Sequence, residues 1–321
     1  MRTFKNFVTF TLLLFSIQSI GQSFPNKPVK IIVPYGAGGI SDIAARIIAN
    51  KLSQMWQQAV IVDNKVGGGG FIAMNAVAKS DPDGHTLLVA TVAEFTIAQH
   101  LNKNQSFNTA NEFIPISLLL DTPMLIVVNA DKNINSVSQL INQSKAQTGG
   151  ISFASPGIGT LNHLMGERFA AEAGAKLVHI PYKGGAQAVL AIVSGEVPIG
   201  VAGAAVVTSF IESGKLKVLG LASRQRSKEH PDWPTLIESG LKDFVESNWV
   251  AIAAPQGVSK EIIQKMNTDI NKVLQLDDVK EQILKLGAEP VGSSPEILSE
   301  RIKKDSDRYG KLIEKLKLKL D

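Results

Sequence analysis

The chain has 321 residues, of which 44% are hydrophobic and 19% charged, and its formal net charge is +4. The charged fraction is below the ~25% of average proteins, and the hydrophobic fraction is large enough to form ordinary cores. Together these two fractions exclude a disordered chain. The small net charge, without a Lys/Arg run interleaved with aromatic residues, argues against nucleic acid as a partner.

Residues 1–23 predict a cleaved secretory signal peptide. Arg2 and Lys5 form a positive region, and 7–17 is an apolar stretch of 11 residues, shorter than the ~20 residues that span a bilayer. The alternative is an uncleaved anchor. The chain has no cysteine, so it can carry neither a cysteine-linked lipid nor a disulfide. We expect cleavage between Ile20 and Phe24, and a soluble protein exported to the periplasm.

The first element after this segment reads as a strand, a glycine-rich loop and a helix. The strand is β-branched over 29–33, the loop covers 34–39, and apolar residues recur at helical spacing over 40–55. Glycines let the backbone approach a ligand closely, and a helix N-terminus leaves about four N–H groups unpaired at its positive end. The segment therefore predicts a site for a small anion. The same pattern returns over 151–173, which suggests an anion held from two sides.

Strand and helix patterns alternate along the rest of the chain. Strands are expected at 59–62, 86–91, 125–129, 151–154, 177–180, 199–202, 217–221 and 250–254. Helices are expected at 71–78, 137–144, 161–173, 186–193, 260–274, 279–286 and 295–318. This alternation predicts an α/β protein with largely parallel sheets, in two lobes with a cleft between them. Open α/β sheets bind ligands beyond the carboxyl ends of their strands, where both glycine loops lie.

Several phrases, in this order and spacing, carry a family resemblance. They are FPNKPV at 24–29, VPYGAGGISD at 33–42, DGHTLL at 83–88, ASPGIGT at 154–160 and PYKG at 181–184. After a signal peptide, they resemble the periplasmic binding proteins of tripartite tricarboxylate transporters, also called the Bug or TctC-like family. The resemblance implies a type II-like two-lobe fold, each lobe a mainly parallel sheet flanked by helices. Lobe 1 would comprise 24–124 and 251–321, and lobe 2 would comprise 125–250.

The same resemblance implies a monomeric solute-binding protein that captures a small organic carboxylate and delivers it to a tripartite membrane permease. One alternative is a ligand-sensing subunit for a two-component sensor kinase. Another, less favoured, is an enzyme on this fold. Five histidines without cysteine or a His-Glu-x-x-His motif give no zinc signature, and no Gly-x-Ser-x-Gly elbow is present. The related porphobilinogen deaminases attach their cofactor through a cysteine, so we expect neither a metal, a cofactor nor catalysis here.

The first glycine loop supplies one half of the expected carboxylate site. Its contacts would come from Tyr35, Gly36, Ala37, Gly38, Gly39 and Ile40, with backbone N–H groups around 36–40 and the Ser41 hydroxyl as donors. On sequence alone, a plain tight turn is the alternative. Asp42 is expected to cap the helix or to hold the loop through backbone N–H groups rather than to touch the ligand.

The second lobe supplies the other half. The Ser155 and Thr160 hydroxyls and the N–H groups of Gly157 and Gly159 would hold the same carboxylate or a bridging water. Thr160 can also cap the helix over 161–173, a role that is compatible with binding. His163 and Lys183 each have two interpretations. His163 either contacts the ligand or packs and hydrogen-bonds a loop, whereas Lys183, next to Gly184 at a further helix start, either pairs with the anion or is simply exposed.

The far end of the pocket departs from the family. Many relatives carry an acidic or amide side chain near Ala202, whereas the residues at 199–205 are small and apolar here. This difference predicts a larger or more hydrophobic pocket. Glu94 also replaces a small polar residue. It is either an exposed glutamate at a helix start or a cleft residue, and in the cleft it would favour an amine or hydroxyl over a second carboxylate.

Overall fold

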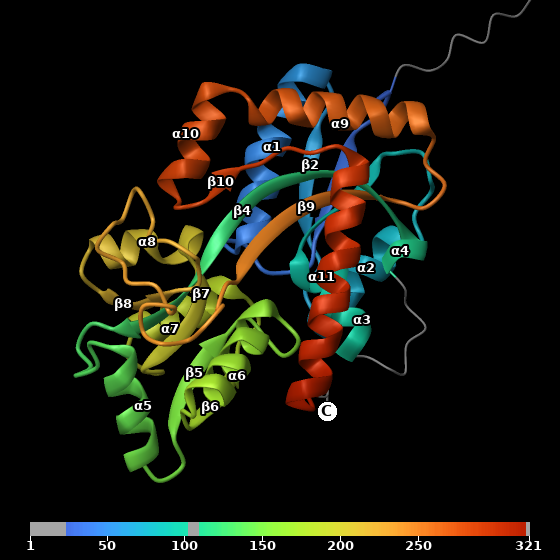
Figure 1. The fold of residues 1–321 in the computed structure, drawn as a ribbon. Helices are drawn as coiled ribbons and strands as arrows, with labels where there is room; N and C mark the ends of the chain where they lie inside the picture. Colours follow the sequence, from blue (N-terminus) through green and yellow to red (C-terminus); the bar gives the residue numbers. More distant parts are fainter. Residues whose placement is uncertain (1–23, 102–108, 319–321) are drawn as a thin grey trace, which may run out of the picture.

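The computed structural model describes residues 24–101 and 109–318, so the expected signal peptide lies outside the described residues. Figure 1 shows two α/β lobes, one above the other, with two long strands running between them. The two-lobe fold expected from the sequence is confirmed. Among the described residues, no helix has the length and apolarity needed to cross a bilayer.

The upper half of the sheet combines parallel and antiparallel strands. β1 pairs in parallel with β2 and β3, while β9 pairs antiparallel with β3 and β4, and β10 pairs antiparallel with β4. These strands are β1 (Val29–Val33), β2 (Val60–Asn64), β3 (Thr86–Thr91), β4 (Phe113–Asn129), β9 (Ser247–Pro255) and β10 (Glu289–Pro290).

The lower half has the same mixed character. β5 pairs in parallel with β6 and β7, and the end of β4 pairs antiparallel with β7 and β8. These strands are β5 (Ile151–Ser155), β6 (Leu177–Pro181), β7 (Ile199–Gly203) and β8 (Leu216–Leu221). The sheets are therefore less parallel than expected, because the strands that cross between the lobes run against their neighbours.

Helices cover both halves. The upper lobe carries α1 (Ile40–Trp56), α2 (Phe71–Ala78), α3 (Ala98–Leu101), α4 (Thr109–Glu112), α9 (Lys260–Leu274) and α10 (Asp277–Lys285). The lower lobe carries α5 (Val137–Ala146), α6 (Leu161–Ala173), α7 (Gly185–Val193) and α8 (Ala204–Glu212). A 3-10 turn precedes α2 at Gly68–Gly70, and a π-helical turn precedes α3 at Ala93–Ile97.

Strand β4 is the first link between the lobes. It pairs with β9 up to Pro123 and with β7 and β8 from Met124 onward. Only 125–129 was expected to be a strand, because Pro123 cannot donate to a ladder and was read as a break. The exchange of partner strands explains why the proline is tolerated there. The division into 24–124 with 251–321 and 125–250 stays a prediction.

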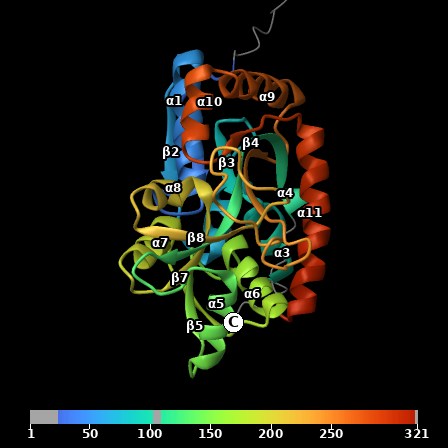
Figure 2. The same cartoon turned by 60° about the vertical axis from the view of Figure 1, so that its left-hand side comes forward.

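The long helix α11 (Pro295–Leu316) joins the lobes on one side, as Figures 1 and 2 show. Arg308 on this helix and Arg168 on α6 both reach the buried Glu246 carboxylate, at 3.1 and 2.7 Å. Tyr309 donates its hydroxyl to the same carboxylate at 2.8 Å. Paired in this way, a buried charge ties together elements far apart in the sequence.

Candidate functional site

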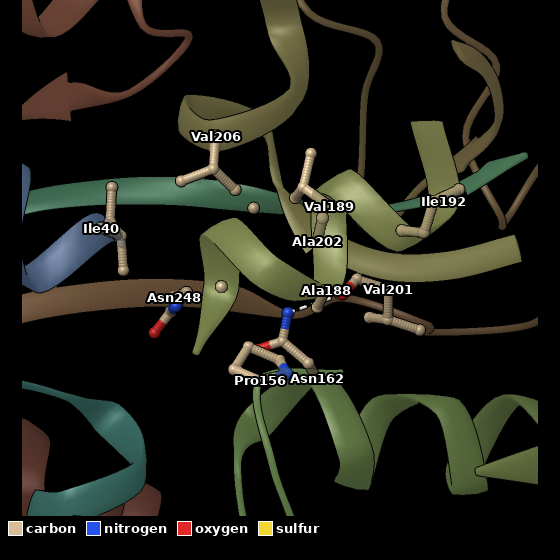
Figure 3. A pocket seen from close by; sticks show the side chains of 12 residues that line it. Ile40, Pro156, Asn162, Ala188, Val189, Ile192, Val201, Ala202, Val206 and Asn248 are labelled. Atoms are coloured by element: carbon tan, nitrogen blue, oxygen red, sulfur yellow. Dashed lines mark hydrogen bonds between the residues drawn. The ribbon is translucent and has the colours of Figure 1, made fainter. Parts of the chain in front are cut away.

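Two small adjoining cavities, each of about 40 Å³, lie where the two lobes meet. Ile40, Pro156, Asn162, Gly185 and Asn248 line both of them. The first cavity extends along α7 and β7, as Figure 3 shows, and the second extends toward the loop before α1. The site is thus built from the starts of several helices and from the strand β9 that links the lobes.

Helix α1 presents an open N-terminus to these cavities. Its N-cap is Gly39, and no side chain accepts a hydrogen bond at that position. The first N–H groups of a helix have no acceptor within the helix and carry its partial positive charge. Gly39, Ile40 and Ser41 all line the second cavity, so these donors lie at its wall.

The loop before α1 is held in place by Asp42. Its carboxylate accepts the Gly38 N–H at 3.0 Å and bonds from the side chains of Arg46 and Asn64 at 3.0 Å each. Burial alone would raise the pKa of Asp42, but these hydrogen bonds lower it below its usual value. The expectation that Asp42 holds the loop is confirmed. The Gly38 N–H is consequently occupied within the protein and is not a free ligand donor in this structure.

Helix α7 faces α1 across the cleft with a second open N-terminus. Its N-cap, Gly184, likewise has no side-chain hydrogen bond, and Gly185 lines both cavities. A methyl group placed on Gly185 would lie 3.8 Å from the Cα of Gly39, and one placed on Gly184 would lie 3.6 Å from the Gly36 nitrogen. Two positive helix ends from different lobes therefore meet at close range.

Two buried polar side chains at the cavities lack partners among the described residues. The Ser41 Oγ atom, on a residue only 1% exposed, makes no hydrogen bond. The Asn248 Oδ1 atom, on a residue 6% exposed, also makes none. A buried hydroxyl or amide without a partner costs about 1–3 kcal/mol, so such groups mark a place where a ligand or water binds.

The loop of the second lobe is more self-contained than expected. Gly157 donates its N–H to Ser155 Oγ at 3.2 Å, and Gly159 donates to His163 Nδ1 at 3.3 Å. The Thr160 hydroxyl donates to the Gly157 carbonyl at 2.8 Å and accepts the His163 N–H as the N-cap of α6. Of these residues Thr160 lines a cavity. Both glycine N–H groups would have to leave their present acceptors to bind a carboxylate.

Two neutral histidines support this loop from behind. His163 and His179 stack with ring centroids 4.1 Å apart, and His179 Nε2 lies 2.5 Å from Ser155 Oγ. Burial lowers the pKa of His163 to about 4. Burial, then the nearby His163, lowers the pKa of His179 to about 3. The reading of His163 as a packed histidine that hydrogen-bonds a loop is confirmed, and direct ligand contact stays a prediction.

Glu94 is fully buried, so its interpretation as an exposed residue at a helix start is wrong. Its carboxylate accepts the Thr91 N–H and hydroxyl at 2.8 Å each and the Tyr35 hydroxyl at 2.5 Å. The Thr91 hydroxyl in turn accepts the Ala93 N–H at 3.1 Å. Burial raises the pKa of both Glu94 and Tyr35. Tyr35 and Thr91 line the second cavity, so Glu94 lies behind them.

The predicted ligand-binding residues divide into two groups by position. Those that line a cavity are Tyr35, Gly39, Ile40, Ser41, Thr160 and Ala202. Those that lie outside the two linings are Gly36, Ala37, Gly38, Glu94, Ser155, Gly157, Gly159, His163, Lys183 and Gly184. Lys183 is exposed, and its ammonium has no partner among the described residues. Ligand contact by any of these residues stays a prediction.

The sequence prediction did not include several lining residues, notably Thr91, Pro156, Asn162 and Asn248. Asn162 follows the expected cap of α6, and Asn248 precedes the expected strand 250–254, so neither stands in a motif that predicts ligand contact. Thr91, Asn162 and Asn248 share one signal, a polar residue within the first or last two positions of a helix or strand. Within the described residues, no cluster of His, Asp or Glu could hold a metal ion.

The chain is similar to known proteins over most of its length. Residues 44–318 match the family model TctC, the tripartite tricarboxylate transporter family receptor. The BugT protein of Bordetella pertussis is 36% identical over 275 residues, which cover 85% of this chain and 84% of that protein.

Two solved structures contain carboxylates. Rpa4515 of R. palustris, with adipate, is 26% identical with a TM-score of 0.88, covering 91% of this chain and 98% of that one. MatC of Rhodopseudomonas palustris, with bound malate, is 26% identical with a TM-score of 0.86, covering 90% and 100%.

Proposed function

The chain belongs to the tripartite tricarboxylate transporter receptor family, and we propose that it is a periplasmic solute-binding protein that closes its lobes on a small organic carboxylate. One observation carries the proposal. The glycine-capped N-termini of α1 and α7, from opposite lobes, meet at one buried site beside an unpartnered Ser41 hydroxyl. Adipate and malate in the two similar structures are both carboxylates, which supports the ligand class.

The physical basis of closure is electrostatic. Each helix N-terminus carries roughly half a positive charge, so two of them repel each other when the lobes close without a ligand. A carboxylate between them is attracted to both and would receive N–H bonds from Gly39 to Ser41 and from the start of α7. Binding and closure are then one event, because the anion has its full set of partners only when the lobes are together.

The proposal extends to export and delivery. The N-terminal segment would direct the chain to the periplasm, and the closed, loaded protein would dock on a tripartite permease. N-terminal sequencing of the protein recovered from the periplasm should begin between Ile20 and Phe24. Uptake of the bound carboxylate should require both the chain and its permease, and independence of uptake from this chain would refute the delivery role.

Ligand identity is tested by mass spectrometry of small molecules released from the purified protein, followed by calorimetry with the acids found. The matched control for each acid is its primary amide, which has the same shape but no charge. We expect the acid to raise the thermal midpoint and the amide to leave it unchanged. Equal binding of the acid and its amide would refute an anion site formed by helix ends.

A further inference from the structure

Asn162, in the first turn of α6, presents a fixed hydrogen-bond acceptor to the first cavity. Its Nδ2 donates to the Val201 carbonyl at 2.6 Å, as the dashed line in Figure 3 shows. Because only the nitrogen of an amide can donate, this bond fixes the orientation of the group and leaves Oδ1 as the remaining acceptor. The residue is only 7% exposed. A ligand that fills the cavity therefore faces a carbonyl oxygen whose position is set by the protein.

Asn248, on the lobe-linking strand β9, adds a second amide that the protein does not satisfy. Its side chain makes no hydrogen bond with any described residue, and its Oδ1 atom is buried. In Figure 3 it lies between Ile40 and Pro156, at the junction of the two cavities. A buried amide in this state is stabilised by a ligand that supplies the missing partner.

The walls of both cavities are uncharged, and beyond the two amides the first cavity is apolar. Among the described residues that line either cavity there is no Lys, Arg, His, Asp or Glu. The first cavity is bordered by Val189, Ile192, Val201, Ala202 and Val206. A second carboxylate in this cavity would be buried without a cation, and an ammonium group would be buried without an anion in the wall. Burying either charge unpaired costs free energy. A neutral donor such as a hydroxyl suits the two amides.

The small volume of the cavities in this closed arrangement favours a small ligand. A water molecule needs about 10–15 Å³ by this measure, so each cavity of about 40 Å³ suits roughly three water-sized groups. Together they suit a ligand of roughly six non-hydrogen atoms. That is the size of a three-carbon hydroxy acid and less than that of malate or adipate.

We propose that Asn162 and Asn248 are the specificity-determining residues and that they select a small hydroxy-monocarboxylate, by bonding its hydroxyl while the helix ends bind its carboxylate. This inference rests on the proposed carboxylate function. It distinguishes the chain from a receptor for dicarboxylates, which would need a cation at the far wall. The start of α8 borders that wall, but its Ala205 N–H already donates to the Thr122 hydroxyl.

The test is calorimetry with three probes of matched size: lactate, propionate and alanine. Lactate and propionate differ by one hydroxyl, and lactate and alanine differ by hydroxyl against ammonium. The wild-type protein should bind lactate about five- to tenfold more tightly than propionate, as one net hydrogen bond implies, and should bind alanine more weakly than lactate.

Asn248→Leu removes no hydrogen bond within the protein, so the variant should fold, and its preference for lactate over propionate should fall to about twofold or less. Asn162→Leu should do the same, with a thermal midpoint to confirm folding. Asn50→Leu, on the exposed face of α1, is the control and should keep the wild-type preference.

The outcomes separate the two proposals. If propionate, succinate or adipate binds the wild type as tightly as lactate, the hydroxyl-reading inference is refuted while carboxylate binding stands. A wild-type preference for alanine, or a lactate preference that survives both Leu variants, also refutes it. If no carboxylate binds the folded wild-type protein, the proposed function itself fails.

Discussion

Replacing Ser41 with alanine should raise the stability of the ligand-free protein and lower its affinity for a carboxylate. The Ser41 hydroxyl is buried and unpartnered, which costs about 1–3 kcal/mol, whereas alanine needs no partner and is the better helix former by a few tenths. We expect about 1 kcal/mol of added stability, or about 2 °C in the thermal midpoint of a chain this large. Loss of a hydrogen bond to a charged ligand should weaken binding roughly tenfold.

Ser53, on the same helix, provides the matched control. Its Oγ accepts the Val60 N–H at 2.8 Å, so Ser53→Ala removes a bond that the protein makes and should lower the midpoint. It lies about 18 Å along α1 from Ser41, at 1.5 Å per residue, and should leave affinity unchanged. Differential scanning fluorimetry and calorimetry measure both effects. The reasoning is refuted if Ser41→Ala destabilises the ligand-free protein as much as Ser53→Ala does.

Three further predictions follow from the site. Gly39 has the extended backbone that valine also adopts, so Gly39→Val should leave the unliganded fold intact but overpack the approach of α7 and weaken carboxylate binding about tenfold or more in calorimetry. The pKa values of His163 and His179 are lowered in the folded protein to about 4 and about 3, so the stability that they contribute is present above their unfolded pKa of ~6.5 and is lost as the pH falls toward 4. Glutamine at both positions should therefore flatten the curve of thermal midpoint against pH in this range. An unchanged slope would contradict this. Trp249 is buried on β9 and stacks on Phe95 with ring centroids 5.9 Å apart. In a variant whose other two tryptophans are phenylalanine, its fluorescence should change on ligand addition, and the small-angle scattering radius should decrease. A rigid site would change neither.

The strand–loop–helix units could be predicted from the sequence because their signals are local. The spacing of apolar residues after Gly39 predicts α1 to within one residue of its observed end. The type and position of Thr160 predict that it caps α6, as it does. Asp42 could be assigned to the loop on electrostatic grounds, since a carboxylate beside an anion needs another role. These inferences involve residues within four positions of each other.

The features that the sequence did not predict depend on partners distant in the chain or on a local motif that was not recognised. β4 continues through Pro123 because its partner strand changes there. Before this point it pairs with β9, which lies more than a hundred residues later in the chain, and after it with β7 and β8. Helix α8 went unpredicted because its apolar first turn continues the apolar run of β7. Glu94 was an avoidable miss: Thr91 and Glu94 stand at capping-box spacing, which predicts that the Glu94 carboxylate accepts the Thr91 N–H, as it does.

The helix starts that border the cavities differ in their caps: Thr160 caps α6 with its side chain, whereas α1, α7 and α8 begin at glycines. Ser136, Thr160, Ser259 and Ser294 each cap a helix through a side-chain hydrogen bond. The N-caps of α1, α7 and α8 are glycines without one, and all three helix starts border the cavities. At α8 the Thr122 hydroxyl, from β4, accepts the Ala205 N–H instead.

Helices α2 and α10 also lack a side-chain cap, but their first residues line neither cavity. Among the helices whose caps the described residues show, α1 and α7 therefore combine an open end with a place at the cleft. A serine cap at either position would supply from within the protein the acceptor that the ligand's carboxylate provides. Gly184→Ser should accordingly weaken carboxylate binding while making the ligand-free closed state easier to reach, because it removes part of the repulsion between the two helix ends.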